Sequence, residues 1–156
     1  KDVDEIVSAV HYPDKGVRGV GLARAQGYGT RFHEYRKWLL KEAVIIVQIE
    51  HVDAVKNVKE ILSCEDVDGY IIGLYDLSST MGLAGQFDHP DVVAALKNIR
   101  EEGSVAKKPG GLHIVEPNQE ELKLRIGEGF RFLAYSVDER MLDVSCRAGL
   151  KVRDQI

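Results

Sequence analysis

The segment Ala43-Val44-Ile45-Ile46-Val47-Gln48-Ile49-Glu50 decides the fold class of this chain. It is an almost continuous apolar run rich in β-branched residues, which is typical of a parallel strand covered on both faces. An apolar repeat at helical spacing follows over residues 55–62, and a second buried strand is predicted over 69–74. Together these segments predict one β-α-β unit.

Working outward from this unit, the same alternation of patterns continues in both directions. A helix over 3–10, a glycine-containing loop over 11–29 and a helix over 31–41 are expected before it. After it we expect a helix from Pro90 to Gly103, a strand over 111–115, a helix over 117–128, a strand over 130–135 and a last helix from about Asp138. Four strands, each followed by a helix, predict a parallel α/β architecture. The pattern alone leaves open whether these units form a small open sheet or half of a closed barrel.

Size and charge limit the classes of function. The 156 residues suffice for one domain but fall short of the roughly 250 of a complete eight-unit barrel. The net charge of -4, from 21 basic and 25 acidic residues, gives no reason to expect nucleic acid as a partner. The longest apolar runs are far shorter than the roughly 20 residues of a membrane-spanning helix, and no charged leader precedes one. We therefore expect no membrane partner and a cytoplasmic location.

Polar side chains stand at the carboxyl ends of the first two predicted strands. Alternation places Gln48 and Glu50 on one face of the first strand, and Asp76 comes just after the second. Because neighbouring parallel strands lie about 4.8 Å apart, Glu50 and Asp76 could meet at one small cation such as Mg²⁺ or Mn²⁺. Taken singly, Asp76 could instead cap a helix, Glu50 could be solvated, and Gln48 could be a satisfied core amide.

The same residues carry a resemblance to a known family. Gln48-Ile49-Glu50, the segment Val67-Asp68-Gly69-Tyr70-Ile71-Ile72-Gly73-Leu74-Tyr75-Asp76-Leu77-Ser78 and Met81-Gly82 resemble the HpcH/HpaI class II aldolases, which act on 2-oxo acids. Residues 18–25, His89-Pro90 and 109–111 also resemble segments of that family. The likeness therefore covers nearly the whole chain.

The resemblance implies a (β/α)8 TIM barrel, of which residues 1–156, as a single domain, supply strands five to eight. It implies a class II aldolase or lyase that cleaves or forms a carbon-carbon bond next to a 2-oxo acid. Glu50 and Asp76 would bind the divalent metal, with Co²⁺ as a further candidate beside Mg²⁺ and Mn²⁺. Gln48 would contact the 2-oxo acid, and the backbone amides of Tyr75 and Asp76 would cradle its carboxylate. The chain departs from the family at Leu74, where proline is usual.

In that family a histidine for proton transfer and a charge-stabilising arginine come from the first half of the barrel, and neither motif occurs here. We therefore expect no catalytic residue of that kind in this chain. His51 should point away from Glu50 and be structural. Either these residues are a portion of a longer polypeptide, which we favour because a half-barrel leaves open edges, or the chain is a weakly active half-barrel.

The expected partners are a 2-oxo acid, an aldehyde and further copies of the chain in a homo-oligomer. A different class of function stays open beside this hypothesis. A self-contained flavodoxin-like α/β binding or regulatory domain without catalysis would have about this length.

Overall fold

Four parallel strands form one sheet in the order β1-β2-β3-β4, so each strand pairs with the next in the sequence. This computed structural model describes residues 2–153. The elements in chain order are α1 (Asp2–Val10), the 3-10 helix η1 (Arg24–Gln26), α2 (Phe32–Glu42), β1 (Ile46–Ile49), α3 (Val52–Lys56), α4 (Val58–Ser63), β2 (Gly69–Ile72), α5 (Leu74–Thr80), α6 (Pro90–Val105), β3 (Gly110–Ile114), α7 (Gln119–Gly127), β4 (Phe132–Tyr135) and α8 (Asp138–Arg153). The predicted parallel α/β architecture is confirmed.

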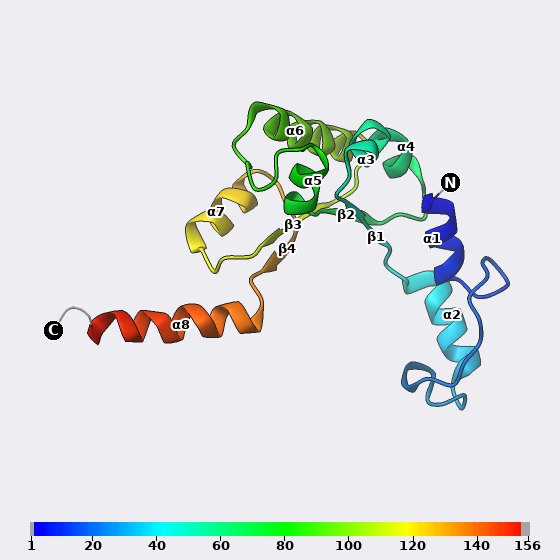
Figure 1. Cartoon of the computed structure of the whole chain (residues 1–156). Helices are drawn as coiled ribbons and strands as arrows, with labels where there is room; N and C mark the ends of the chain where they lie inside the picture. Colours follow the sequence, from blue (N-terminus) through cyan, green and yellow to red (C-terminus); the bar gives the residue numbers. More distant parts are fainter. Residues whose placement is uncertain (1, 154–156) are drawn as a thin grey trace.

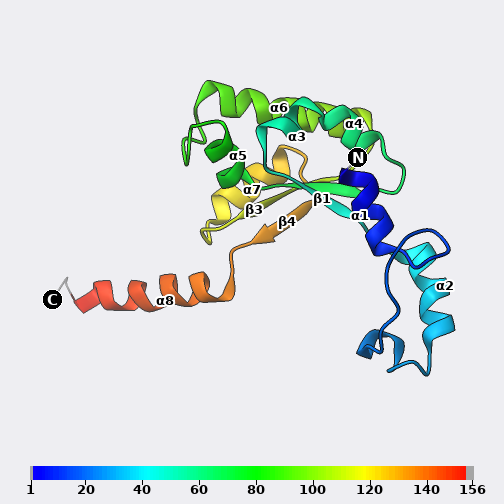
Figure 2. The same ribbon diagram turned by 45° about the vertical axis from the view of Figure 1, so that its right-hand side comes forward.

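One face of the sheet carries the core. Alternate residues of β1, β2 and β3 point to this face and lie almost fully buried against the helices, namely Val47, Ile49, Tyr70, Ile72, Leu112 and Ile114. Buried side chains of α4, α5 and α6 complete this cluster, among them Leu62, Leu77 and Ile99. Figures 1 and 2 show α3, α4 and α6 gathered over this side of the sheet.

The opposite face of the sheet stays accessible in the part of the chain that the structure describes. Val44, just before β1, is 71% exposed, and Phe132 in β4 is 45% exposed. Gln48 is exposed as well. The prediction that the first strand is covered on both faces is therefore wrong for residues 2–153. We call this surface the open face, meaning the side of the sheet that carries Gln48, Ile71, Gly111 and Phe132 in one row of the register.

Several helices differ from the sequence prediction. The helix expected over 55–62 is two short helices, α3 and α4, separated at Asn57, whose φ of -106° and ψ of 11° depart from helical geometry. No helix was assigned between the second strand and Pro90, where the structure has α5. Helix α6 continues past Gly103, where it was expected to end, to Val105. Glycine at this position makes room for the ring of Tyr70 and does not terminate the helix.

The first and last parts of the chain extend from opposite edges of the sheet, next to β1 and β4. In Figure 1, α1 and α2 lie beyond β1, whereas α8 projects beyond β4. Arg140 anchors the start of α8, since its Nε lies 2.8 Å from Oε1 of Glu116, in the loop after β3. The hydrogen bond from this guanidinium holds the pKa of Glu116 below its usual range. Among the described residues, no helix combines the length and the apolar character needed to cross a membrane.

A tyrosine fills the space between β2, β3 and α6. Tyr70 is 3% exposed, and its burial raises the pKa of its phenol. A Cβ added at Gly103 would lie 2.5 Å from Cε1 of Tyr70, and one added at Gly110 would lie 2.5 Å from its hydroxyl oxygen. Both positions therefore require glycine, because the ring of Tyr70 lies too close to leave room for a side chain.

We expect Gly103→Ala to lower the free energy of unfolding by about 1–3 kcal/mol, because overpacking against a buried ring outweighs the better helix propensity of alanine. Gly127→Ala is the matched control in α7, where an added Cβ meets no atom within 4 Å. It should leave stability unchanged or raise it by up to about 1 kcal/mol. Urea unfolding of both variants tests this, and equal effects of the two substitutions would contradict the packing argument.

Candidate functional site

The carboxyl end of β1 places two polar side chains on the open face. Gln48 lies in the strand, Glu50 is the first residue after it, and the side-chain Nε2 of Gln48 donates a hydrogen bond to Oε2 of Glu50. Glu50 is half-buried, whereas Gln48 is exposed. Gln48 is therefore not a satisfied core amide. It is an exposed side chain that orients a carboxylate.

A glycine on the neighbouring strand makes room for this pair. The amide of Gly73 donates to the carbonyl of Ile49 at 3.1 Å, which carries the β1–β2 pairing one residue beyond the strands. A Cβ added at Gly73 would lie 2.7 Å from Oε2 and 2.8 Å from Cβ of Glu50, and 3.0 Å from Nε2 of Gln48. The φ of Gly73 is -82°, which any residue adopts. Glycine is therefore required here by space alone, and the sequence analysis did not identify it.

Asp76 lies in the first turn of α5, the helix that begins at Leu74, directly after Gly73. The N-cap of α5 is Gly73, so Asp76 does not serve as the helix cap. The first intrahelical bond runs from the amide of Leu77 to the carbonyl of Gly73 at 2.8 Å, so the amides of Tyr75 and Asp76 precede it. These amides are the ones that the resemblance assigned to a carboxylate.

Buried residues fix the position of this short helix. Leu77 and Ser78 have no exposed surface, and Leu77 belongs to the main core. The hydroxyl of Ser78 donates to the carbonyl of Tyr75 at 2.8 Å and accepts from the amide of Gly85 at 3.2 Å. The exposed Asp76 side chain thus stands on a turn that its buried neighbours hold in place.

The charges at this edge suit a cation. Among residues 2–153, no lysine or arginine forms an ion pair with Glu50 or Asp76. The described residues also contain no group of three or more His, Cys, Asp and Glu side chains arranged to hold a metal. Residues 2–153 therefore offer no more than Glu50 and Asp76 as carboxylate ligands at this edge. Mg²⁺ commonly binds in this way, with one or two carboxylates and the remaining positions left to water and substrate.

The histidine next to Glu50 has a structural role, as alternation predicted. His51 is the N-cap of α3, and its Nδ1 accepts a hydrogen bond from the amide of Asp53 at 3.1 Å. Its ring therefore points toward the first turn of α3. This arrangement separates His51 from the side chain of Glu50.

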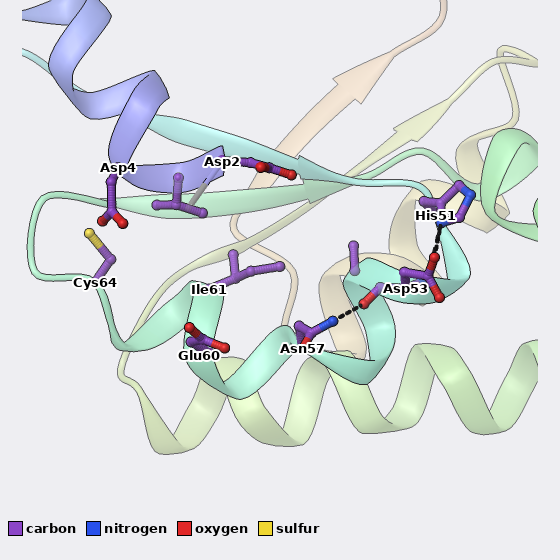
Figure 3. A pocket seen from close by; sticks show the side chains of 10 residues that line it. Asp2, Asp4, His51, Asp53, Asn57, Glu60, Ile61 and Cys64 are labelled. Atoms are coloured by element: carbon purple, nitrogen blue, oxygen red, sulfur yellow. Dashed lines mark hydrogen bonds and ion pairs between the residues drawn. The ribbon is translucent and has the colours of Figure 1, made fainter.

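A cavity of about 540 Å³ lies apart from this edge, among the helices. Figure 3 shows it between the start of α1 and helices α3 and α4, with Asp4, Asp53, Glu60 and Cys64 on its walls. The carboxylates give it a negative character, and Asp53 already pairs with Lys56 at 2.7 Å. The lysine and His51 lower the pKa of Asp53. The cavity belongs to the outer helical layer and contains neither Glu50 nor Asp76.

The family model and the relatives that match this chain by sequence all have aldolase in their names. The family model for HpcH/HpaI aldolase/citrate lyase matches residues 1–143. A 4-hydroxy-2-oxo-heptane-1,7-dioate aldolase of Escherichia coli (strain ATCC 8739) is 41% identical over 144 residues, which cover 88% of this chain and 52% of the relative. The enzyme of that name from Salmonella typhimurium is 39% identical, over 87% of this chain and 51% of the relative.

Solved structures agree with these relatives. An HpcH/HpaI aldolase/citrate lyase family protein from Burkholderia cenocepacia superposes with a TM-score of 0.88 at 28% identity, covering 97% of this chain and 60% of that one. An HpcH/HpaI aldolase from Desulfitobacterium hafniense gives a TM-score of 0.82 at 27% identity, covering 98% and 59%. The chain thus spans about half the length of the relatives that it matches.

We expect Gly73→Ala to weaken Mn²⁺ binding at least about tenfold, because the added methyl displaces the carboxylate of Glu50. The backbone conformation suits alanine, but Cβ of Glu50 would lie 2.8 Å from the added methyl and must shift, so the melting temperature should also fall by several degrees. Isothermal titration with Mn²⁺ provides the measurement. The double variant Gly73→Ala/Glu50→Asp, with a shorter acid, should recover part of the affinity, and wild-type affinity in the single variant would disprove the steric role.

Proposed function

The chain belongs to the HpcH/HpaI aldolase/citrate lyase family, and we propose that its protein is a class II aldolase that acts on 2-oxo acids. The observation that carries this proposal is the carboxylate of Glu50, oriented by Gln48 and packed against Gly73 at the strand ends. The reaction would cleave or form a carbon-carbon bond next to the 2-oxo group. The names of the relatives support this class of reaction.

Within the proposal, this chain supplies strands five to eight of a (β/α)8 barrel. The accessible open face of the sheet supports this, because the inside of a barrel is closed by strands of the same barrel. The length of the relatives supports it as well, since each is about twice as long as the matched region. A flavodoxin-like domain would instead carry helices on both faces of its sheet. Here the helices that build the core lie on one face.

Glu50 and Asp76 would hold the divalent metal, Mg²⁺ or Mn²⁺, with Co²⁺ as a further candidate. The residues present fit such an ion: both are carboxylates without basic partners among residues 2–153, and Gly73 leaves the space in which Glu50 lies. When bound, the cation would act as a Lewis acid toward negative charge that develops on the keto oxygen of the substrate.

The remaining groups of this chain would bind and orient the substrate. One N–H of the Gln48 amide is engaged by Glu50, which leaves the second for an oxygen of the 2-oxo acid. The amides of Tyr75 and Asp76, at the start of α5, would donate to the substrate carboxylate. Leu74, which replaces the usual proline, lies within the first turn of α5, where its side chain is half-buried. The loop therefore reaches α5 without a proline.

The group that moves the proton and the arginine that stabilises charge would come from outside this chain, from the other half of the barrel. The expected location is cytoplasmic. The substrates would be small molecules, a 2-oxo acid and an aldehyde. Apart from that base and that arginine, residues in the described part of the chain would fill every role in metal and substrate binding named above.

A homo-oligomer is the expected assembly. Apolar side chains along α8 are exposed, among them Leu142 and Leu150, at 67% and 61%. Size-exclusion chromatography with light scattering should give a mass that is a multiple of the mass of one polypeptide. A mass equal to a single polypeptide would contradict this part of the proposal.

We expect Glu50→Ala and Asp76→Ala each to reduce Mn²⁺ affinity at least about tenfold, with little change in the far-ultraviolet circular dichroism. The physical reason is the loss of one of two anionic ligands. Glu101→Ala is the matched control, since Glu101 is an exposed carboxylate on α6 that faces Lys97 at 3.7 Å. Unchanged Mn²⁺ affinity in both site variants, measured by isothermal titration, would exclude the metal site.

A further inference from the structure

The register of the sheet sets Glu50 and a histidine in the same row of the open face. Ile49 pairs with Ile72, and Ile72 pairs with Leu112. One residue further along each strand, the row therefore reads Glu50, Gly73, His113, and it continues to Ala134, which pairs with His113. Gly73 has no side chain and Ala134 has only a methyl group. Glu50 and His113 are thus the two large side chains of this row, and the space over Gly73 between them holds the carboxylate of Glu50 and the amide of Gln48.

His113 differs from its neighbours in β3. Every other residue of the strand is buried, including Leu112 and Ile114 on the face covered by the helices. His113 is half-buried and points to the open face, the face that carries Gln48 and Glu50. A hydrophobic residue would suit a buried strand better. The imidazole therefore lies on the same face as the two polar side chains of β1 that the proposed site uses.

A hydrogen bond fixes the orientation and the tautomer of this ring. Its Nε2 lies 3.2 Å from the carbonyl oxygen of Ser136. Because a carbonyl oxygen only accepts, Nε2 carries the proton, and Nδ1 of the neutral ring remains an acceptor. His51 and His89 use their Nδ1 atoms to cap α3 and α6. The Nδ1 of His113 accepts no such hydrogen bond among the described residues.

Ser136, which holds the ring, has an unusual backbone. Its φ is +58°, in the left-handed region that few residues other than glycine adopt. Hydrogen bonds to β3 and the loop after it maintain it: its amide donates to Ile114 O at 2.7 Å, its hydroxyl donates to Val115 O at 2.8 Å, and its carbonyl accepts from His113. Strained residues held in this way concentrate at functional sites. The arrangement presents the imidazole in one fixed orientation.

We propose that His113 binds the substrate, with Nδ1 accepting a hydrogen bond from the hydroxyl group of a 4-hydroxy-2-oxo acid. This inference rests on the proposed function and adds a residue of this chain that would bind one group of the substrate. The aldol product of pyruvate and an aldehyde carries its hydroxyl two carbons beyond the keto group. Two strand spacings, about 9.6 Å, separate the backbones of Glu50 and His113, so a substrate whose keto end lies at Glu50 and Asp76 can reach the His113 side chain.

Two substitutions separate ligand binding from a purely structural role. His113→Asn keeps an acceptor near the position of Nδ1 but loses the reach to Ser136. His113→Gln reaches the carbonyl of Ser136 with its amide but loses the acceptor at Nδ1. The measured quantity is the ratio of the Kd of 2-oxopentanoate to that of 4-hydroxy-2-oxopentanoate. Isothermal titration of the Mn²⁺-loaded protein gives both constants, with released pyruvate monitored to correct for turnover.

We expect the wild-type protein to bind the hydroxylated acid roughly tenfold more tightly, as one buried hydrogen bond allows. The Asn variant should keep most of this preference, and the Gln variant should lose it, while Mn²⁺ affinity stays unchanged in both. A wild-type ratio near one, or a preference kept by Gln and lost by Asn, would overturn the role of His113. A wild-type protein that binds neither Mn²⁺ nor either acid would overturn the proposed function itself, and this inference with it.

Discussion

In-register parallel pairing of four short strands is the constraint on which the rest of the structure depends. Because all four strands run in one direction without a shift that would mix the two faces, alternate residues are sorted into a covered face and an open face. The covered face makes the core with α4, α5 and α6. The open face receives Gln48, Glu50 and His113. Their positions follow from the same hydrogen bonds that hold the sheet.

Glycines then determine which side chains can pack closely against the backbone. Gly103 and Gly110 admit the ring of Tyr70 between α6 and β3, which fixes the helical layer on the sheet. On the open face, Gly73 admits the side chains of Glu50 and Gln48. In each case the glycine is needed for the volume that it leaves empty. Packing and site geometry are thus built by the same physical means, because well-packed interiors tolerate little added volume.

The sequence analysis was correct where local pattern and burial agree. It identified all four strands, because each is an apolar run bounded by polar or glycine residues. It expected both faces of the first strand to be covered, whereas within residues 2–153 one face is open. Hydrophobicity records that a residue avoids water and does not record which part of a protein shields it. It also missed α5, whose segment of seven residues is too short to show a helical repeat. The resemblance nevertheless placed Asp76 and its amides in that segment.

The sequence by itself determined the order of strands and helices, the parallel α/β class and the presence of Gln48, Glu50 and Asp76 at strand ends, because these follow from periodicity within short segments. Only the tertiary structure decided that Gly73 is a neighbour of Glu50 and that His113 shares a row with Glu50. These relations join residues that lie up to 63 positions apart in the chain. They depend on the register between strands, which hydrogen bonds across the sheet fix and which no local pattern contains.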